Sequence, residues 1–463
     1  MSVQPAETDL LQHSISPLLA GQALTLAPIE HYFVADQRAD YPLTFLSMAT
    51  LTGQVDRPAF ERAMAVAVAR TPFLSARLQT TSRGRSTWQI DQTVAPVVKW
   101  VDGEWPLDTA SLNTIDLRNE PGIRTWVGQW QGLTRVVMQI HHACVDGVGS
   151  CQFVGDLVTA YARELERGVG HELRPIEPAT LEYRLKIERP AGPRPSLWRV
   201  IRFLAIQTNQ FFNRRPIILQ PSQHTKDKPA PALFPNVEER VLDENQAAEL
   251  RTWSTAHGAT ANEALLAVFY QTLAQWNALH PGPGKWLRVL VPTNLRGLKH
   301  QETPACNLLG FAFLDRRPDE CNSPVALLPE IVRQLGLVKK NLLGRTFLDA
   351  IAVVHSLGLL QWMTSACQST ATAVFSNPGD PSRRFLSRLP KFKGKPVFGN
   401  LILEAFTGVT PLRPGTRVGL LVTGNQTRLN LTWNTDPNYF TAEDRAALIA
   451  RYEANLQAML AGE

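Results

Sequence analysis

The stretch that decides the fold runs from residue 134 to residue 147 and reads TRVVMQIHHACVDG. Residues 134–140 form a short stretch rich in β-branched side chains, which predicts a buried strand. That strand runs directly into His141 and His142, and Asp146 and Gly147 follow after a three-residue spacer. We therefore expect a local order of strand, histidine pair, short turn and helix.

The segment after Asp146 predicts an amphipathic helix that Gly168 would end, because its apolar side chains recur at helical spacing. These side chains are Phe153, Val154, Leu157, Val158, Tyr161 and Leu165. Asp146 suits two roles: it can be the N-cap of this helix, or its carboxylate can pair with a buried arginine and hold the loop. Gly147 has no side chain and would keep the region beside the histidine ring open.

The two histidines are not expected to share one task, because consecutive residues on a strand point to opposite faces. If one ring faces a cleft, the other is structural. The same geometry argues against a metal site built from both rings. Asp146 would complete a set of two histidines and one carboxylate only if the strand ended between them. A lone imidazole, held in one tautomer by a backbone carbonyl, is suited to take a proton from an alcohol or amine.

Strands and helices alternate on both sides of this motif. Before it, we expect a strand at 45–51 and a helix over 57–70, with Asp56 as N-cap and a core face of Phe60, Met64, Ala67 and Val68. After it, we expect strands near 237–242, 287–291, 397–405 and 417–434, and helices at 244–257, at 260–276 and from 441. This alternation predicts a two-lobed α/β sandwich.

A proline-rich stretch from about residue 168 to 238 predicts the connection between two halves. We predict a first lobe over 1–180 that carries the histidine pair, a connection over 181–238 and a second lobe over 239–463. Within the connection, residues 197–212 are aromatic, apolar and basic. They predict either a surface-seeking helix that contacts a lipid-like substrate or membrane, or a helix packed across the seam between the lobes.

Composition narrows the class of protein. The chain has 463 residues and a net charge of +6, with no long run of like charges, so a nucleic-acid-binding tail is not indicated. A mild positive charge favours phosphorylated ligands such as coenzyme A, or an acidic carrier protein. The five cysteines show no CxxC pair, which favours a reduced compartment over a disulfide framework or a zinc site.

Targeting and membrane signals are weak. The first residues, MSVQPAETDLLQHS, lack the basic-then-apolar order of a secretion signal. The longest apolar stretch, at 350–363, is interrupted by His355 and Gln361 and is shorter than a membrane span needs. We therefore expect a cytoplasmic protein.

The pattern HHxxxDG at 141–147 resembles the signature of an acyltransferase superfamily that includes chloramphenicol acetyltransferase, peptide-synthetase condensation domains and wax ester synthases. Other landmarks of that superfamily are similar to segments at 26–30, 53–60, 70–74, 260–266, 291–296, 307–310 and 375–379. The last of these, FSNPG, resembles a serine-asparagine segment of the wax ester synthases and their diacylglycerol acyltransferase relatives. The resemblance covers nearly the whole chain. It implies two chloramphenicol-acetyltransferase-like lobes, each a mixed β-sheet packed with helices, with an active-site tunnel between them.

The resemblance also implies roles for the residues of the motif. His142 would be the general base and Asp146 a structural residue, with Arg296 as its expected partner. His141 would be supportive, and Gly147 would lie beside the site. No metal, no cofactor and no covalent acyl-enzyme are implied, and the chain has no GxSxG elbow.

A further pair of residues could line the acyl site. A donor must stabilise the oxyanion of the tetrahedral intermediate, and Ser376 or Asn377 could contribute to that site. Alternatively, Ser-Asn-Pro-Gly at 376–379 forms only a turn.

The function expected from these features is acyl transfer from a thioester, either acyl-coenzyme A or an acyl carrier protein in trans, to a hydroxyl or amine. Lipid esterification of the wax ester synthase or diacylglycerol acyltransferase type is one alternative, and a natural-product enzyme of the condensation type is another. A catalytically silent, condensation-like chain that recruits a partner protein is a third. The expected partners are small molecules or lipids, with peripheral membrane contact as an option and no nucleic acid. Two pseudo-equivalent lobes favour a monomer.

Overall fold

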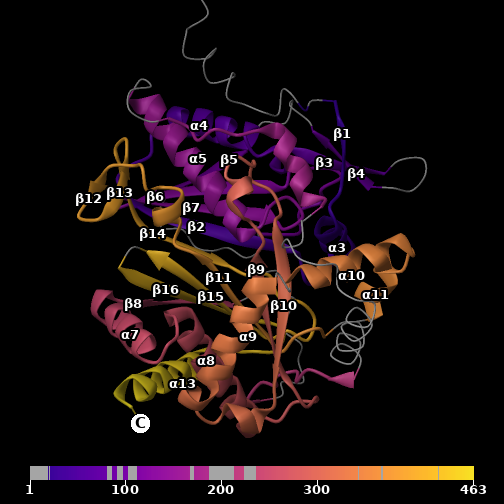
Figure 1. Ribbon diagram of the computed structural model, residues 1–463. Coiled ribbons are helices and arrows are strands. Elements are labelled where there is room, and N and C mark those ends of the chain that lie inside the picture. Colours follow the sequence, from indigo (N-terminus) through magenta and orange to yellow (C-terminus); the bar gives the residue numbers. More distant parts are fainter. Residues whose placement is uncertain are drawn as a thin grey trace, which may run out of the picture.

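Two large β-sheets organise the chain in the computed structural model (Figure 1). The structure describes residues 19, 21–80, 86–90, 97–102, 112–166, 172–186, 213–223, 236–341, 344–366, 369–425 and 427–462. The segment 197–212, Gly168 and Cys367 lie outside the described residues, so the predictions made for them stay open. Over the described ranges each sheet is mixed and packed with helices, as the sequence predicts for an α/β fold.

The first sheet has its strands in the order β12-β13-β14-β2-β7-β6-β5. The strand that precedes the histidine pair, β7, is antiparallel to both of its neighbours, β2 and β6, and β5 adds in parallel to β6. The bounds are β2 Thr44–Thr52, β5 Val98–Asp102, β6 Ile123–Trp130 and β7 Leu133–His141.

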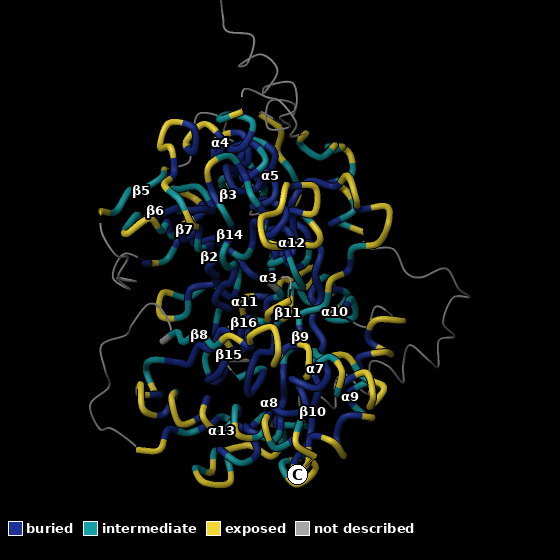
Figure 2. Tube along the Cα trace, turned by 90° about the vertical axis from the view of Figure 1, so that its left-hand side faces the viewer, coloured by how far each residue is buried: buried dark blue, intermediate teal, exposed yellow. Residues whose placement is uncertain are grey.

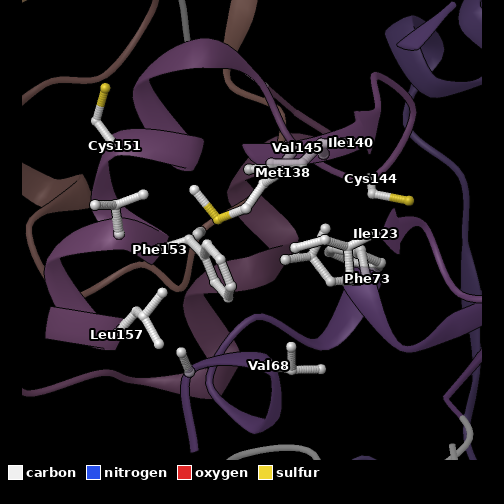
Figure 3. Packing of buried hydrophobic residues seen from close by; sticks show 14 of the residues in the cluster. Val68, Phe73, Ile123, Met138, Ile140, Cys144, Val145, Cys151, Phe153 and Leu157 are labelled. Carbon is white, nitrogen blue, oxygen red and sulfur yellow. The ribbon is translucent and has the colours of Figure 1, made fainter. Parts of the chain in front are cut away.

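Two capped helices and a core join this sheet into the first lobe. Asp56 accepts a hydrogen bond from the backbone of Ala59 and begins α4 (Arg57–Ala69), and Asp146 begins α5 (Gly147–Leu165). The apolar faces predicted for both helices are buried in one cluster with β2 and β7, except that Leu165 is only partly buried. Figure 3 shows side chains from β7 and α5 gathered in this core.

The second sheet has the order β10-β9-β11-β15-β16-β8. Helices α7, α8, α9 and α13 pack on it through a second apolar cluster, and Thr260 caps α8 in a reciprocal capping box. The strands are β8 Asn236–Leu242, β9 Leu287–Asn294, β10 Leu309–Arg316, β11 Ala373–Gly379, β15 Val418–Asn425 and β16 Arg428–Thr435. The helices are α7 Glu244–Ala256, α8 Ala261–Leu279, α9 Pro324–Asn341 and α13 Ala442–Ala461.

A strand exchange links the two lobes. The strands at one edge of the first sheet come from the second half of the chain. They are β12 Lys391–Phe392, β13 Lys395–Phe398 and β14 Leu401–Val409. β14 pairs with β2 from Ile402 opposite Thr52 to Val409 opposite Leu46. The proposed division at 1–180, 181–238 and 239–463 therefore did not anticipate that part of 239–463, the predicted second lobe, completes the first sheet.

Smaller elements complete the described chain. One group of three helices lies at the right-hand side of Figure 1, where the two halves meet: α3 Pro28–Asp36, α10 Gly344–Ser356 and α11 Leu360–Ala366. A three-stranded sheet contains β1 Ala23–Thr25, β3 Ala76–Thr80 and β4 Ser86–Ile90, and the short helix α12 spans Pro381–Arg384. Single 3₁₀ turns occur at Pro72–Leu74, Pro178–Arg184, Leu298–His300 and Pro318–Cys321.

Burial follows this layering. Figure 2 shows buried chain running through the sheets and the helices against them, and exposed chain mainly at the periphery. No single described helix has the length and apolarity to cross a membrane, whereas α10 and α11, bent by 118° at their junction, pass that test only when taken together.

Candidate active site

His142 lies immediately after the end of β7, at the seam between the two lobes. Its backbone N–H donates to the carbonyl of Leu43 at 2.8 Å. Phe33 of α3 stacks on the imidazole with ring centroids 4.2 Å apart, and Phe45 of β2 meets it edge-on at 5.1 Å. His142 as a whole is half-buried, and its Nδ1 is buried beneath these aromatic side chains.

This apolar surrounding determines the charge state of His142. Burial lowers the pKa of its imidazole to about 4, although the carbonyl oxygen of the same residue and the carboxylate of Asp146 act in the opposite direction. The ring is therefore neutral at pH 7. Nδ1 is buried and, among the described residues, has no hydrogen bond of ordinary geometry. The acceptor that favours a proton on this ring is thus the residue's own carbonyl oxygen.

His141 faces a different environment, as the strand geometry predicts. Its side chain is only 2% exposed, and its Nδ1 accepts a hydrogen bond from the backbone N–H of Ala143 at 3.1 Å. Burial, with a smaller contribution from His142, lowers the pKa of His141 to about 3. This histidine is a neutral residue that braces the turn.

Asp146 combines both of the roles that the sequence left open. One carboxylate oxygen caps α5 by accepting from the N–H of Gly149 at 2.7 Å. The other accepts from Arg296 Nη1 and from the N–H of Leu308, each at 2.8 Å. Arg296 also donates to the carbonyl of Cys306 at 2.7 Å. The carboxylate therefore joins the histidine motif to the second lobe.

The Asp146–Arg296 pair is buried on both sides, with side-chain exposures of 3% and 5%. Burial by itself lowers the pKa of the Arg296 guanidinium, but the charge and hydrogen bond of Asp146 raise it, and the net shift is upward. All the oxygens of Asp146 and two nitrogens of Arg296 are engaged within the protein. Both residues consequently shape the loop and are not presented to a substrate.

Asn307 is a residue whose role sequence reasoning missed, although its segment was noted as a landmark. Its side-chain nitrogen donates to the carbonyls of His142 at 3.0 Å and Ala143 at 2.7 Å. The side chain is almost fully buried at 1% exposure. It therefore holds the carbonyl that faces the His142 ring. A buried polar residue directly before an apolar strand was the available signal.

The glycines of the motif differ in what they tolerate. A Cβ at Gly147 would meet only Pro378 at 3.8 Å, an ordinary contact, and the prediction that this glycine keeps the region beside the histidine ring open stays a prediction. A Cβ at Gly149 would lie 2.4 Å from a methyl of Val145 and 3.0 Å from the carbonyl of Cys306. The close approach of the second lobe thus requires Gly149, which sequence reasoning did not single out.

Ser376 and Asn377 lie at the end of β11, and Pro378 beside them faces Gly147. Phe375 is buried in the second core, so alternation directs Ser376 toward the opposite face of the sheet. The Asn377 side chain donates to Asn262 at 2.7 Å and accepts from the N–H of Gly379 at 2.8 Å. The contacts of Asn377 are therefore those of a turn, whereas Ser376 is half-buried and its role stays a prediction.

Other chemistries find little support in this region. Burial raises the pKa of Cys151 and Cys306 to about 12 and that of Cys144 well above its usual value, so these thiols are not activated nucleophiles. β7 does end at His141, which was the condition for a metal set, but Asp146 is committed to Arg296. Within the described ranges no group of three or more His, Cys, Asp or Glu could hold a metal ion.

Access to the site involves α3, which the sequence did not predict as a helix. Its buried residues Ile29, Tyr32, Phe33 and Asp36 follow helical spacing, and Pro28 begins the helix. Through Phe33 this helix covers His142, and Tyr32 and Phe33 both contact Phe311 of the second lobe. A small apolar void lies within the first lobe, between the sheet and α4 and α5. The tunnel between the lobes stays a prediction.

Comparisons with known proteins place this fold. No family model matches the chain. The first condensation domain of the CDA synthetase superposes with a TM-score of 0.66, over 96% of this chain and 97% of that one, at 16% identity. The epimerization domain from the third module of tyrocidine synthetase B gives a TM-score of 0.66 over 95% and 97%, at 12% identity.

A third solved structure is a mutant starter condensation domain of rhizomide synthetase in complex with C8-CoA and Leu-SNAC. It gives a TM-score of 0.64 over 99% of this chain and 97% of that one, at 11% identity. In sequence, an uncharacterized protein found in two strains of Mycobacterium tuberculosis is 25% identical over 305 residues, 65% of this chain and 68% of its own. The chain therefore has the two-lobed fold of condensation and epimerization domains over nearly its full length.

Proposed function

We propose that this chain is an acyltransferase that moves an acyl group from a thioester to a hydroxyl or amine, with His142 as the general base. The observation that carries the proposal is a neutral imidazole at the seam of a condensation-type fold, whose Nδ1 is buried without a partner among the described residues and whose own carbonyl favours a proton on the ring. That arrangement favours the tautomer with the proton on Nδ1. It leaves Nε2 with a free lone pair for an incoming O–H or N–H.

The reaction follows from this tautomer. The acceptor oxygen or nitrogen attacks the thioester carbonyl carbon as Nε2 of His142 takes its proton, which gives a tetrahedral oxyanion and an imidazolium. The carbon–sulfur bond then breaks, the carbonyl re-forms, and the imidazolium returns the proton to the leaving thiolate. A pKa near 4 makes the imidazolium a strong acid, which favours this return.

Asn307 and the Asp146–Arg296 pair support His142 without touching the reacting atoms, whereas Ser376 is a candidate for direct contact with the reacting groups. Asn307 holds the carbonyl that faces Nδ1. The Asp146–Arg296 pair holds the turn between the histidines and α5 against the second lobe. Ser376 is our candidate for lining the oxyanion site, because it lies on the sheet face opposite the second core and beside Pro378, which faces Gly147.

The substrate class is argued from what surrounds the ring. Phe33 and Phe45 contact His142, and Phe311 lies against Phe33, so the immediate walls are apolar. Apolar walls favour an acyl chain or a lipid acceptor over a small charged substrate. Lipid esterification is therefore the form of acyl transfer that we favour, with acyl-coenzyme A or a carrier protein as donor, in the cytoplasm.

The test is release of free thiol from acyl-coenzyme A donors of different chain length, in the presence of pooled alcohols, diacylglycerol and amines. The wild type should release thiol in an acceptor-dependent way, and His142→Ala should lower the rate by roughly 10²–10⁴-fold. His257→Ala, at an exposed histidine after α7, is the matched control and should leave the rate unchanged. Equal rates for His142→Ala and wild type would exclude His142 as the base. No thiol release with any donor and acceptor would favour the recruiting role.

A further inference from the structure

The helices α10 and α11 form a bent unit with an unusual surface, which we call the elbow and define as residues 350–366. Over these residues the sequence contains no Asp, Glu, Lys or Arg. Four large apolar side chains of the elbow are nevertheless exposed: Val353 by 59%, Leu357 by 65%, Leu359 by 46% and Trp362 by 66%. Exposed large apolar side chains concentrated on a segment without formal charge indicate an interaction site.

The elbow is fastened to the body of the protein on its other side. Leu348 and Ile351 of α10 and Leu360 of α11 are buried in the first core. His355 stacks on His31 of α3 with ring centroids 3.8 Å apart. The exposed side chains therefore belong to a pair of helices whose other side is packed against the protein core.

The C-terminal end of the elbow is also tied to α3. Thr364 donates its hydroxyl to the carbonyl of Ala35 at 3.1 Å, and its own carbonyl accepts from Arg38 at 2.7 Å. Together with the burial of Leu348 and Ile351 of α10, these contacts of Thr364 tie both helices to the body of the protein, and the pair could not cross a bilayer without breaking them. This geometry favours a helix pair that lies on a membrane surface over one that crosses the bilayer.

We propose that the elbow docks on the surface of a phospholipid membrane that contains anionic lipids. Taken together, the two helices have the length and composition of a membrane-inserted segment, although they are bent by 118°. Trp362 and the leucines at the bend are side-chain types that enter the boundary between headgroups and acyl chains. Insertion of the bend exposes no formal charge to the apolar layer, because the elbow carries none.

The charge around the elbow selects an anionic surface. Lys339 and Lys340 are exposed at the end of α9, before the N-terminal end of α10, where Lys339 lies 4.0 Å from Glu263. Arg345 of α10 pairs with Asp349, and Arg38 lies against α11. The chain as a whole has a net charge of +6. Basic groups beside an apolar insertion are attracted by anionic headgroups, and this attraction weakens with salt.

The position of the elbow connects docking with the proposed site. α10 and α11 both pack on α3, and Phe33 of α3 covers His142. Figure 1 shows the three helices together at one edge of the molecule, at the level where the lobes meet. A lipid substrate at this edge would lie next to the helix that covers His142. Docking itself does not depend on catalysis, so the two proposals fail independently.

The test is flotation of the full chain with vesicles in the absence of any substrate. One set of vesicles contains only phosphatidylcholine, and a second mixes phosphatidylcholine with phosphatidylglycerol. The variant Leu357→Glu/Trp362→Glu changes the elbow, and Leu279→Glu/Leu298→Glu places the same charges at exposed leucines elsewhere. Thermal melting checks that both variants fold as the wild type does, as expected for exposed positions.

We expect the wild type and the control variant to float with the mixed vesicles, and to float less with phosphatidylcholine alone or at high salt. The elbow variant should show a partition coefficient lower by about a hundredfold, since two apolar side chains no longer leave water. Equal flotation of the elbow variant and the wild type would overturn the proposal. So would a wild type that floats with neither vesicle, including one that instead self-associates through Leu357 and Trp362.

Discussion

Replacing Asp146 by alanine is the perturbation that most directly tests how the motif is held. The change removes the partner of Arg296, whose side chain is only 5% exposed, and leaves the N–H groups of Leu308 and Gly149 without their acceptor. Breaking a buried ion pair by deleting one partner costs about 3–5 kcal/mol, because the remaining charge stays desolvated. We expect Asp146→Ala to lower the free energy of unfolding by about that amount.

The matched control is Asp102→Ala. Asp102 also pairs with an arginine, Arg57, at 3.3 Å, but the side chains are 97% and 51% exposed. A pair of this kind contributes about 0–1 kcal/mol, because water screens it. The contrast between the two substitutions therefore isolates burial as the cause.

The assay is equilibrium unfolding in urea, followed by tryptophan fluorescence and by circular dichroism so that any separate unfolding of the lobes is detected. The double variant Asp146→Ala/Arg296→Met also removes the buried, unpaired positive charge of Arg296. It should therefore recover about 1 kcal/mol or more of the lost free energy of unfolding. If Asp146→Ala costs no more than Asp102→Ala, the buried pair does not join the lobes in solution and the reasoning is refuted.

Three further predictions follow from the same region. Gly149→Ala should cost about 1–3 kcal/mol of unfolding free energy, since its Cβ would overlap Val145, whereas Gly147→Ala should cost little; equal melting temperatures for the two variants would contradict the contact distances. The pKa of His141 is lowered to about 3 in the folded protein. Below about pH 6.5 the unfolded state therefore binds a proton at this residue that the folded state does not bind. His141 should consequently lower the free energy of unfolding by about 2 kcal/mol between pH 7 and pH 5. His141→Asn should reduce the fall in stability by its own share in urea titrations at both pH values, because His142, with a pKa near 4, still contributes; an unchanged fall would exclude a contribution from His141. Asn307→Leu should lower the kcat of thiol release by about tenfold or more and shift its pH profile, because the backbone carbonyl of His142 loses its hydrogen-bond donor. A change in KM alone would instead indicate a purely structural role for Asn307.

The order of elements around the motif could be predicted from local patterns. β-branched residues before His141, the cap at Asp146 and the apolar repeat in 153–161 each report on their own neighbours in the chain, and β7 and α5 formed where they indicate. The same holds for Asp56 with α4 and Thr260 with α8. Such signals are local, because a hydrogen bond within one helical turn or a period of apolar side chains needs no distant partner.

The candidate site was only partly predictable. The motif identified His142, Asp146 and Gly147, and Arg296 is the partner of Asp146 that was expected. Phe33 and Asn307 were missed, since each acts through a contact with a residue more than a hundred positions away along the chain. A ring that stacks on a distant residue, or a side chain that donates to a distant carbonyl, produces no periodic pattern in the neighbouring sequence.

The sequence by itself determined the α/β class, the strand–turn–helix that presents His142, and the identity of the pair that braces it. Only the tertiary structure decided that Asp146 serves as cap and ion-pair partner at once, that β14 from the second half completes the first sheet, and that Phe33 covers the ring. The physical reason is the range of the interactions. Helix and strand propensity, helix capping and the amphipathic period depend on residues only a few positions apart. The burial of a side chain, its pKa and the packing of the two lobes depend on which distant segments of the chain come together and exclude water.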